Sequence, residues 1–216
     1  MTFGKNSVSW SLGLPALFFI WLCLLGPAPL SVAHAAPQSE PEAGTPGWDV
    51  EQLLERLSKN RQAEARFEET VSSNLLTQPL KTRGTLHFTP PAGLEKHITA
   101  PYDERYVVEG DRVFFENKTK ATKKTVSLHD YPALRAFIEA FRSTLANDLL
   151  TLRRFYRVEL QGEPQRWVLI LHPLDTAVQE LVESIRLSGV LEQVRSIEIL
   201  APGGDRSVMV ITPGAQ

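Results

Sequence analysis

Residues 83–117 contain four short segments in which apolar and polar side chains alternate, and this pattern constrains the fold more than any other. The segments are residues 84–88, 94–99, 104–108 and 113–116, with Pro- or Gly-containing breaks between them. Alternation of period two places successive side chains on opposite faces of a β-strand, while Pro and Gly mark turns. The stretch therefore predicts a four-stranded antiparallel meander with one apolar face.

The apolar face of the meander is predicted to hold six side chains: Leu86, Phe88, Leu94, Ile98, Tyr106 and Val108. Thr85, His87 and Glu95 point the other way. Upstream, residues 62–71 have the same period, with Phe67 on the apolar side. The alternation is equally consistent with a solid core beneath this face and with a bound guest.

Two helices are predicted on either side of the meander. The first begins near Asp49 and ends near Asn60, and the second spans residues 131–147. Helical spacing gives the second helix an apolar stripe of Leu134, Phe137, Ile138, Phe141 and Leu145, and predicts the opposite face for Arg135, Glu139 and Arg142. Such a stripe usually packs on a sheet, and it could equally cover a cavity.

Five further strands are predicted in the C-terminal third, at residues 155–161, 165–172, 182–188, 194–200 and 207–211. Together with the upstream segments they make about ten antiparallel strands in one α+β domain with two or three helices. So many successive hairpins curl naturally into a barrel or half-barrel because β-sheets twist. The striped helix would then lie inside the curve or across its mouth.

The N-terminal segment has the composition of an export signal. Residues 12–25 are apolar for fourteen residues, and residues 33–35 have the small-x-small form of a signal-peptidase site. An uncleaved anchor is the alternative, but a membrane span needs roughly 20 residues. We therefore predict a signal peptide over residues 1–35, a flexible Pro- and Gly-containing leader over 36–47, and a domain over 48–216.

The position of the only cysteine indicates the compartment in which the domain works. The only cysteine, Cys23, lies within the predicted signal peptide, so the exported chain could hold no disulfide. An exported protein without disulfides is typical of the periplasm of a Gram-negative bacterium. A formal net charge of −2 gives no basic footprint for nucleic acid.

Residues that would carry enzymatic chemistry are not arranged in any recognisable motif. The sequence has no G-x-S-x-G, H-E-x-x-H, P-loop or G-x-G-x-x-G. The histidines beyond the signal peptide do not pair at metal-ligand spacing: His87, His97, His129 and His172. We therefore expect no catalytic residues, no metal and no cofactor, with an unrecognised hydrolase as a remaining rival.

Two stretches of the meander carry a family resemblance. The sequences PAGLEKHITAP at residues 91–101 and VVEGDRVFF at 107–115 resemble the outer-membrane lipoprotein carrier family, LolA. In that family one strand ends in a proline, the next ends in another proline, and a hairpin follows with an acidic-Gly-x-x-aromatic turn. The strands around Phe67 and Leu86 also fit, and the order of elements is similar over residues 48–211.

The resemblance implies an unclosed antiparallel β half-barrel of eleven strands, with helices as a lid over a hydrophobic cavity. It implies a periplasmic carrier that takes a lipid-anchored cargo from an inner-membrane exporter to an outer-membrane acceptor without catalysis, and we expect it to act as a monomer. The cavity side chains would be Phe67, Leu86, Phe88, Leu94, Ile98, Tyr106, Val108, Leu134, Phe137, Ile138 and Phe141.

This sequence departs from the family pattern at two positions. The family arginine that bonds the lid is replaced by Pro90, and an aromatic position is replaced by Lys96. The usual latch is therefore absent, and the cargo stays open between a lipoprotein and another lipid or glycolipid. A half-barrel module with a filled interior, binding a protein partner in envelope assembly or regulation, is the alternative function.

Overall fold

Eleven antiparallel strands form one continuous sheet in the computed structural model, which describes residues 47–59 and 64–214. The predicted signal peptide and residues 36–46 of the predicted leader lie outside these residues. The strands are β1 (Glu64–Ser72), β2 (Leu80–Thr89), β3 (Gly93–Ala100), β4 (Glu104–Glu109), β5 (Arg112–Asn117), β6 (Thr122–Ser127), β7 (Tyr156–Glu163), β8 (Arg166–Pro173), β9 (Ser184–Val190), β10 (Gln193–Leu200) and β11 (Arg206–Pro213).

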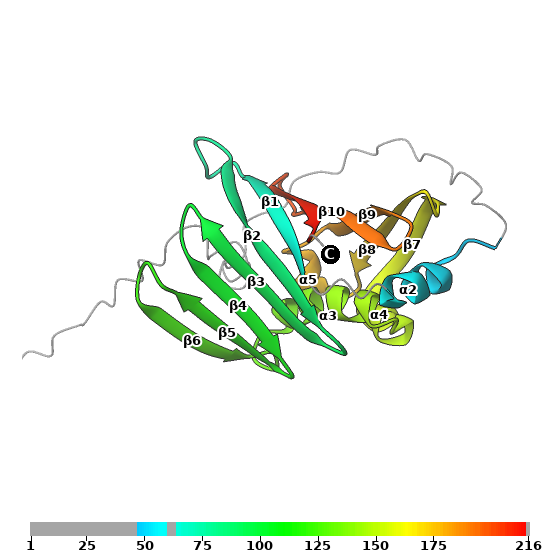
Figure 1. Cartoon of the computed structure of the whole chain (residues 1–216), viewed down its shortest axis with the longest axis horizontal. Coiled ribbons are helices and arrows are strands. Elements are labelled where there is room, and N and C mark those ends of the chain that lie inside the picture. The colour runs from blue at the N-terminus through cyan, green and yellow to red at the C-terminus, as the bar shows by residue number, and fades with distance from the viewer. Residues whose placement is uncertain (1–46, 60–63, 215–216) are drawn as a thin grey trace, which may run out of the picture.

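The order of strands across the sheet is β6-β5-β4-β3-β2-β1-β11-β10-β9-β8-β7, so β6 and β7 are free edges and the barrel is unclosed. Every pair is antiparallel, and all pairs except β1 with β11 join neighbours in the chain. Figure 1 shows the sheet bent into two halves, with helices crossing the space between them. The predicted α+β half-barrel is confirmed, with one strand more than the residue pattern alone indicated.

Four helices accompany the sheet in the described part of the chain: α2 (Val50–Lys59), α3 (Pro132–Leu145), α4 (Leu149–Phe155) and α5 (Thr176–Gln179). The helix predicted over residues 131–147 is shorter, and α4 was not predicted. Asp148 begins α4 by accepting a hydrogen bond from the Thr151 amide at 2.9 Å. The helix is too short for an apolar period to stand out, and its last residue had been assigned to a strand.

Side chains predicted to share a face do so in the observed register. Leu86 stands opposite Lys96, Phe88 opposite Leu94, and Leu94 opposite Val108, so these residues face the concave side. β2 and β3 also approach very closely at a register shift beside Gly84. A Cβ atom on Gly84 would lie 1.8 Å from the His97 carbonyl oxygen, which only a glycine avoids.

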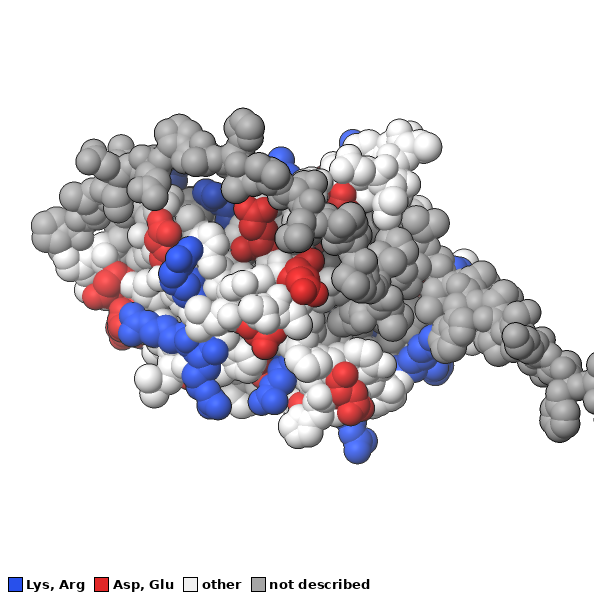
Figure 2. Space-filling model, turned by 180° about the vertical axis from the view of Figure 1, so that it is seen from behind, with Lys and Arg blue, Asp and Glu red and all other residues white. Residues whose placement is uncertain are grey.

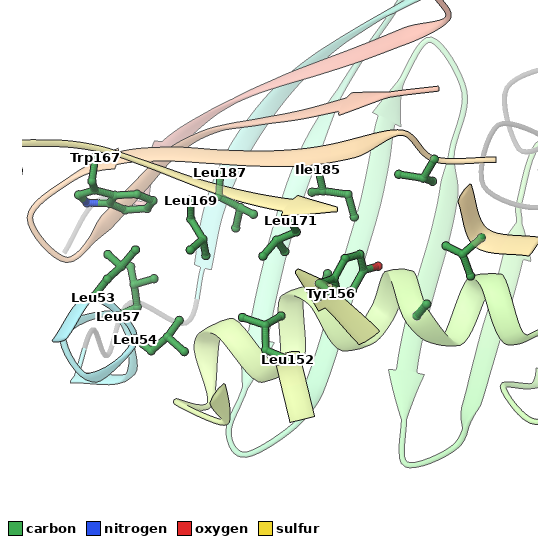
Figure 3. Close-up of a cluster of buried hydrophobic side chains, with 14 residues drawn as sticks. Leu53, Leu54, Leu57, Leu152, Tyr156, Trp167, Leu169, Leu171, Ile185 and Leu187 are labelled. Atoms are coloured by element: carbon green, nitrogen blue, oxygen red, sulfur yellow. The ribbon is translucent and has the colours of Figure 1, made fainter. Parts of the chain in front are cut away.

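The β7–β10 half of the half-barrel is filled by a solid core. Trp167, Leu169 and Leu171 on β8, with Ile185 and Leu187 on β9, project from the concave face and are almost completely buried. Figure 3 shows them meeting Leu53, Leu54 and Leu57 of α2, with Leu152 of α4 and Tyr156 completing the cluster. The helices are therefore anchored to this half of the sheet, with burial of each large apolar side chain worth about 1.5–3 kcal/mol.

Charged side chains of both signs lie at the surface. On the coloured part of the face seen in Figure 2, acidic and basic side chains are interspersed among uncharged ones, and neither sign dominates. Arg105 forms two hydrogen bonds of 2.7 Å with Glu95, and Arg206 lies 2.6 Å from Glu198. These are cross-strand pairs, and exposed pairs of this kind add little stability.

Candidate functional site

The predicted cavity side chains divide into separate packed groups. The first group surrounds Phe67 and Ile98 on the β1–β3 part of the concave face, with Leu86 and Tyr106 packed against them. The second lies at the other end of the same half and contains Val108 and Ile138, with Leu94 and Leu134 against them. Phe137 and Phe141 instead join the core of the β7–β10 half, and Phe88 is half-buried outside all three groups.

These groups differ in how tightly they are closed. Phe67, Ile98, Val108 and Ile138 are each less than a tenth exposed, whereas Leu86, Leu94, Tyr106 and Leu134 keep intermediate exposure. The second group joins α3 to the sheet, because Leu134 and Ile138 of that helix meet Val108, Val113 and Leu128. Where α3 meets the β1–β6 half, apolar side chains from both therefore contact one another.

Arg142 makes a polar connection between α3 and the β1–β6 half. Its Nε donates to the carbonyl of Ala92 at 2.7 Å, and one terminal nitrogen donates to the carbonyl of Gly110 at 2.6 Å. The other terminal nitrogen lies 3.6 Å from Glu139. The predicted solvent-facing position of Arg142 was wrong, because its side chain is only 9% exposed.

The Arg142 connection matters because the sequence lacks the family arginine that bonds the lid. Pro90 is exposed and offers no side-chain donor, as expected. The guanidinium comes from the helix instead, and its acceptors are the turns that join β2 to β3 and β4 to β5. We call Arg142 and the carbonyls of Ala92 and Gly110 the clasp.

A buried ion pair lies on the concave face of β1–β3. Lys96 approaches Glu69 to 2.6 Å, and their side chains are 12% and 6% exposed. Ser207 and Thr82 donate to the same carboxylate at 2.8 Å and 3.3 Å. Burial alone would raise the pKa of Glu69, but Lys96 and these hydroxyls together hold it below its usual value.

A second buried carboxylate, Glu104 of β4, has neutral partners. The Asn117 amide donates to one oxygen at 2.7 Å, and the Tyr106 hydroxyl donates to the other at 3.0 Å. Glu104 is 2% exposed, and among the described residues no basic side chain forms an ion pair with it. Burial raises the pKa of Glu104, and the two hydrogen bonds, with the charges of Lys120 and Lys96, offset this only in part.

Tyr102, in the turn between β3 and β4, packs against the group around Phe67 and Ile98. Its hydroxyl is buried and makes no hydrogen bond within the described chain. Burial raises its pKa, and the negative charges of Glu104 and Glu69 raise it further. We call Glu104, Tyr102, Tyr106 and Asn117 the Glu104 cluster.

The Glu104 cluster and the clasp lie at opposite ends of the β1–β6 half. Successive turns of an antiparallel meander alternate between its two ends. The turns holding Ala92 and Gly110 are therefore at one end, next to α3. Glu104 and Asn117 stand opposite each other where β4 begins and β5 ends, so they adjoin the other end. The concave face runs from an apolar end under the helix to a polar end away from it.

Sequence reasoning named the apolar residues of this face and missed its charged ones. The signal was present, because the same alternation that places Phe67 and Ile98 inside also places Glu69, Lys96 and Glu104 there. Glu69 and Lys96 are 27 positions apart in the chain. Nothing in the local pattern pairs them.

The described residues contain no group of three or more His, Cys, Asp or Glu side chains placed to hold a metal ion. Within the same residues, no helix combines the length and the apolar character needed to cross a membrane. Apolar surface and the buried polar groups are therefore the features on which a functional proposal can rest.

Comparison with known proteins gave one match over most of the sequence. The family model described as "Outer membrane lipoprotein carrier protein LolA-like" matches residues 42–216. No curated protein sequence matches the chain.

Solved structures resemble the fold at low sequence identity. A LolA superfamily protein from Nitrosomonas europaea is 10% identical over 76% of this chain and 91% of that one, with a TM-score of 0.39. LprF from Mycobacterium bovis is 13% identical over 77% and 93%, with a TM-score of 0.36. The MucA/MucB complex from Pseudomonas aeruginosa is 14% identical over 78% and 58%, with a TM-score of 0.43. Likeness at this level carries no argument about what this chain binds.

Proposed function

The chain belongs to the LolA-like family of outer membrane lipoprotein carrier proteins, as its residue pattern had suggested, and we propose that it is a non-catalytic periplasmic carrier of a lipid-like cargo. The family match over residues 42–216 is the observation that carries this proposal. The unclosed half-barrel with helices on its concave side is the architecture that such a carrier needs.

The cargo site would be the space between α3 and the concave face of β1–β6. The side chains of this face that meet α3 are apolar and pack on one another, so the closed form keeps them out of water. A chain of methylenes that replaced these contacts would gain about 0.8 kcal/mol for each buried CH₂. Binding by burial alone is reversible, which suits a carrier that must release what it collects.

The clasp supplies the closed state. α3 packs with α2, α4 and α5 on the β7–β10 half, and it meets the β1–β6 half through the Leu134–Ile138 contacts and through Arg142. Separating the two halves requires Arg142 to leave both carbonyls. Cargo entry would therefore begin by opening the clasp, and the helix would move with the half to which it is anchored.

The cargo is a lipoprotein or another lipid or glycolipid, taken from an inner-membrane exporter and given to an outer-membrane acceptor by a monomeric carrier. We test this by isolating the protein from the envelope fraction under non-denaturing conditions and measuring its mass by native mass spectrometry. The carrier function predicts a population that is heavier by the mass of a lipid or lipidated molecule.

A substitution in the proposed site makes the test specific. Leu134→Glu places a charge among the apolar contacts of α3 and should abolish lipid retention. Arg135→Glu, on the exposed side of the same helix, should retain it. Circular dichroism and thermal melting verify that both variants are folded. Lipid-free protein from repeated native preparations would overturn the carrier proposal.

One observation favours a second candidate function. Phe67, Ile98, Val108 and Ile138 are tightly packed, as expected of a half-barrel whose interior is filled by its own side chains. Such a module would bind a protein partner on its outside. If acyl probes fail to bind while a partner protein copurifies stoichiometrically, this second function is favoured over the first.

A further inference from the structure

We propose that the Glu104 cluster is a head-group site for an amphiphile that carries an ammonium group. This inference rests on the carrier function and narrows it from a lipid-like cargo to a cationic or zwitterionic one.

Glu104 is a buried carboxylate without a contacting cation. The Tyr106 hydroxyl and the Asn117 amide each donate one hydrogen bond to it. The charges of Lys120 and Lys96 act on it from a distance, and neither forms an ion pair with it among the described residues. Moving a charge out of water is costly unless it is paired, and burial accordingly raises the pKa of Glu104. A bound ammonium would supply the missing counter-charge at this position.

Glu69 provides the comparison within the same concave face. Its carboxylate already holds the ammonium of Lys96 at 2.6 Å, and the same ammonium lies 5.1 Å from the centre of the Phe67 ring. The interior thus already contains one ammonium that contacts both a carboxylate and an aromatic ring. Lys96 forms an ion pair with Glu69, whereas no cation of the described chain contacts Glu104 at ion-pair distance.

Aromatic groups around Glu104 suit the same ligand. Tyr106 hydrogen-bonds Glu104, and its ring lies 5.0 Å from that of Phe115. Tyr102 adds a buried hydroxyl with no hydrogen-bond partner in the described chain. Its oxygen can accept a hydrogen bond from an ammonium, and aromatic faces attract cations. An anionic head would instead meet the charge of Glu104.

The position of the cluster fits the head of an amphiphile whose tail lies under α3. The turns near Glu104 are at the end of the β1–β6 half away from the clasp. Between them the concave face presents Ile98, then Lys96 opposite Tyr106, then Leu94 opposite Val108 towards the helix. The ammonium of Lys96 is held by Glu69. A tail along these strands would reach the apolar contacts of α3 while its head stays at Glu104.

The test compares three ligands with the same twelve-carbon tail: dodecylamine, dodecanol and dodecanoate. Each ligand is titrated against the purified protein loaded with the fluorescent probe N-phenyl-1-naphthylamine, at neutral pH and below the aggregation concentration of the ligand. The loss of probe fluorescence measures displacement. We expect dodecylamine to displace the probe at a concentration about tenfold lower than dodecanol, and dodecanoate to be the weakest.

Two substitutions assign the preference to the cluster. Glu104→Gln removes the charge, while its amide oxygen can accept from Asn117 and its NH₂ can donate to the Tyr106 oxygen. The dodecanol-to-dodecylamine ratio should therefore fall to near one. Tyr102→Phe should lower the ratio in part. The matched control is Glu116→Gln on β5, whose carboxylate pairs with exposed Lys123 at 2.9 Å and whose loss should leave the ratio unchanged.

The outcomes separate this inference from the function on which it rests. If dodecanol displaces the probe and dodecylamine is no better, the head-group site is wrong while the carrier stands. A preference for dodecanoate, or an amine preference that survives Glu104→Gln, also overturns the site. If neither the probe nor any of the three ligands binds, the carrier function fails and this inference fails with it.

Discussion

Replacing Arg142 by alanine should weaken the fold and strengthen the binding of apolar ligands at the same time. The substitution removes two hydrogen bonds, of 2.7 Å to Ala92 and 2.6 Å to Gly110, from a charged donor with little exposure. Hydrogen bonds to charged groups contribute about 1.5–3 kcal/mol each, and water can replace part of this at the freed turn carbonyls. We expect the free energy of unfolding to fall by about 2–4 kcal/mol.

If the proposed carrier function is right, the change in affinity has the opposite sign, because the clasp stabilises the closed state only. A ligand that binds the open state has an apparent affinity reduced by the fraction of molecules that are open. If 2 kcal/mol of the loss falls on the closed state, the apparent dissociation constant for dodecanol should decrease by up to about thirtyfold. Urea denaturation and displacement of N-phenyl-1-naphthylamine measure the two quantities on the same preparation.

Arg135→Ala is the matched control for Arg142→Ala. Arg135 lies on the exposed side of α3, and its guanidinium is 5.8 Å from the centre of the Phe155 ring. An exposed contact of this kind contributes about 0.5–1 kcal/mol, and it does not join α3 to the strands. If Arg142→Ala lowers stability and leaves dodecanol affinity unchanged or weaker, Arg142 is a structural residue and the clasp is not a gate.

Three further predictions follow from the buried charges and the closest strand contact. Lys96→Met leaves Glu69 buried without its cation and should cost about 3–5 kcal/mol in urea denaturation, most of it restored by adding Glu69→Gln. The pKa of Glu104 is higher in the folded than in the unfolded state, so its ionisation costs stability as the pH rises above the unfolded pKa. Glu104→Gln should therefore melt at a higher temperature than the parent at pH 7, and this gain should vanish below about pH 4, where Glu104 is protonated in both states. Gly84→Ala should lower the free energy of unfolding by more than about 3 kcal/mol, because its Cβ would lie 1.8 Å from the His97 carbonyl oxygen, and an unchanged midpoint would contradict the observed register.

The alternation in residues 83–117 was sufficient to predict the meander and its faces. A side-chain period of two is a local property of an extended backbone, so it can be read without knowing what lies opposite. The register confirms that Leu86, Leu94 and Val108 share the concave face. The short helix α4 escaped this reasoning because seven residues do not establish a helical period, although Asp148 was an available capping signal.

The polar interior could not be predicted in the same way. Glu69 and Lys96 belong to different strands, and only the pairing of β1 with β2 and of β2 with β3 brings them to 2.6 Å. Arg142 likewise depends on the path of α3, which carries its guanidinium to carbonyls 32 and 50 positions away in the chain. Hydrogen-bond geometry at this range is a consequence of tertiary packing.

The sequence by itself determined which residues share a face, where the strands turn, and to which family the chain belongs, because strand period and turn residues act locally. The tertiary structure decided how those faces are used. It placed α3 and α4 against the β7–β10 half, turned Arg142 inward to hold the turns, and left Glu104 buried without a contacting cation in the described chain. These outcomes depend on sheet curvature and long-range register, which set distances between segments that the linear pattern leaves independent.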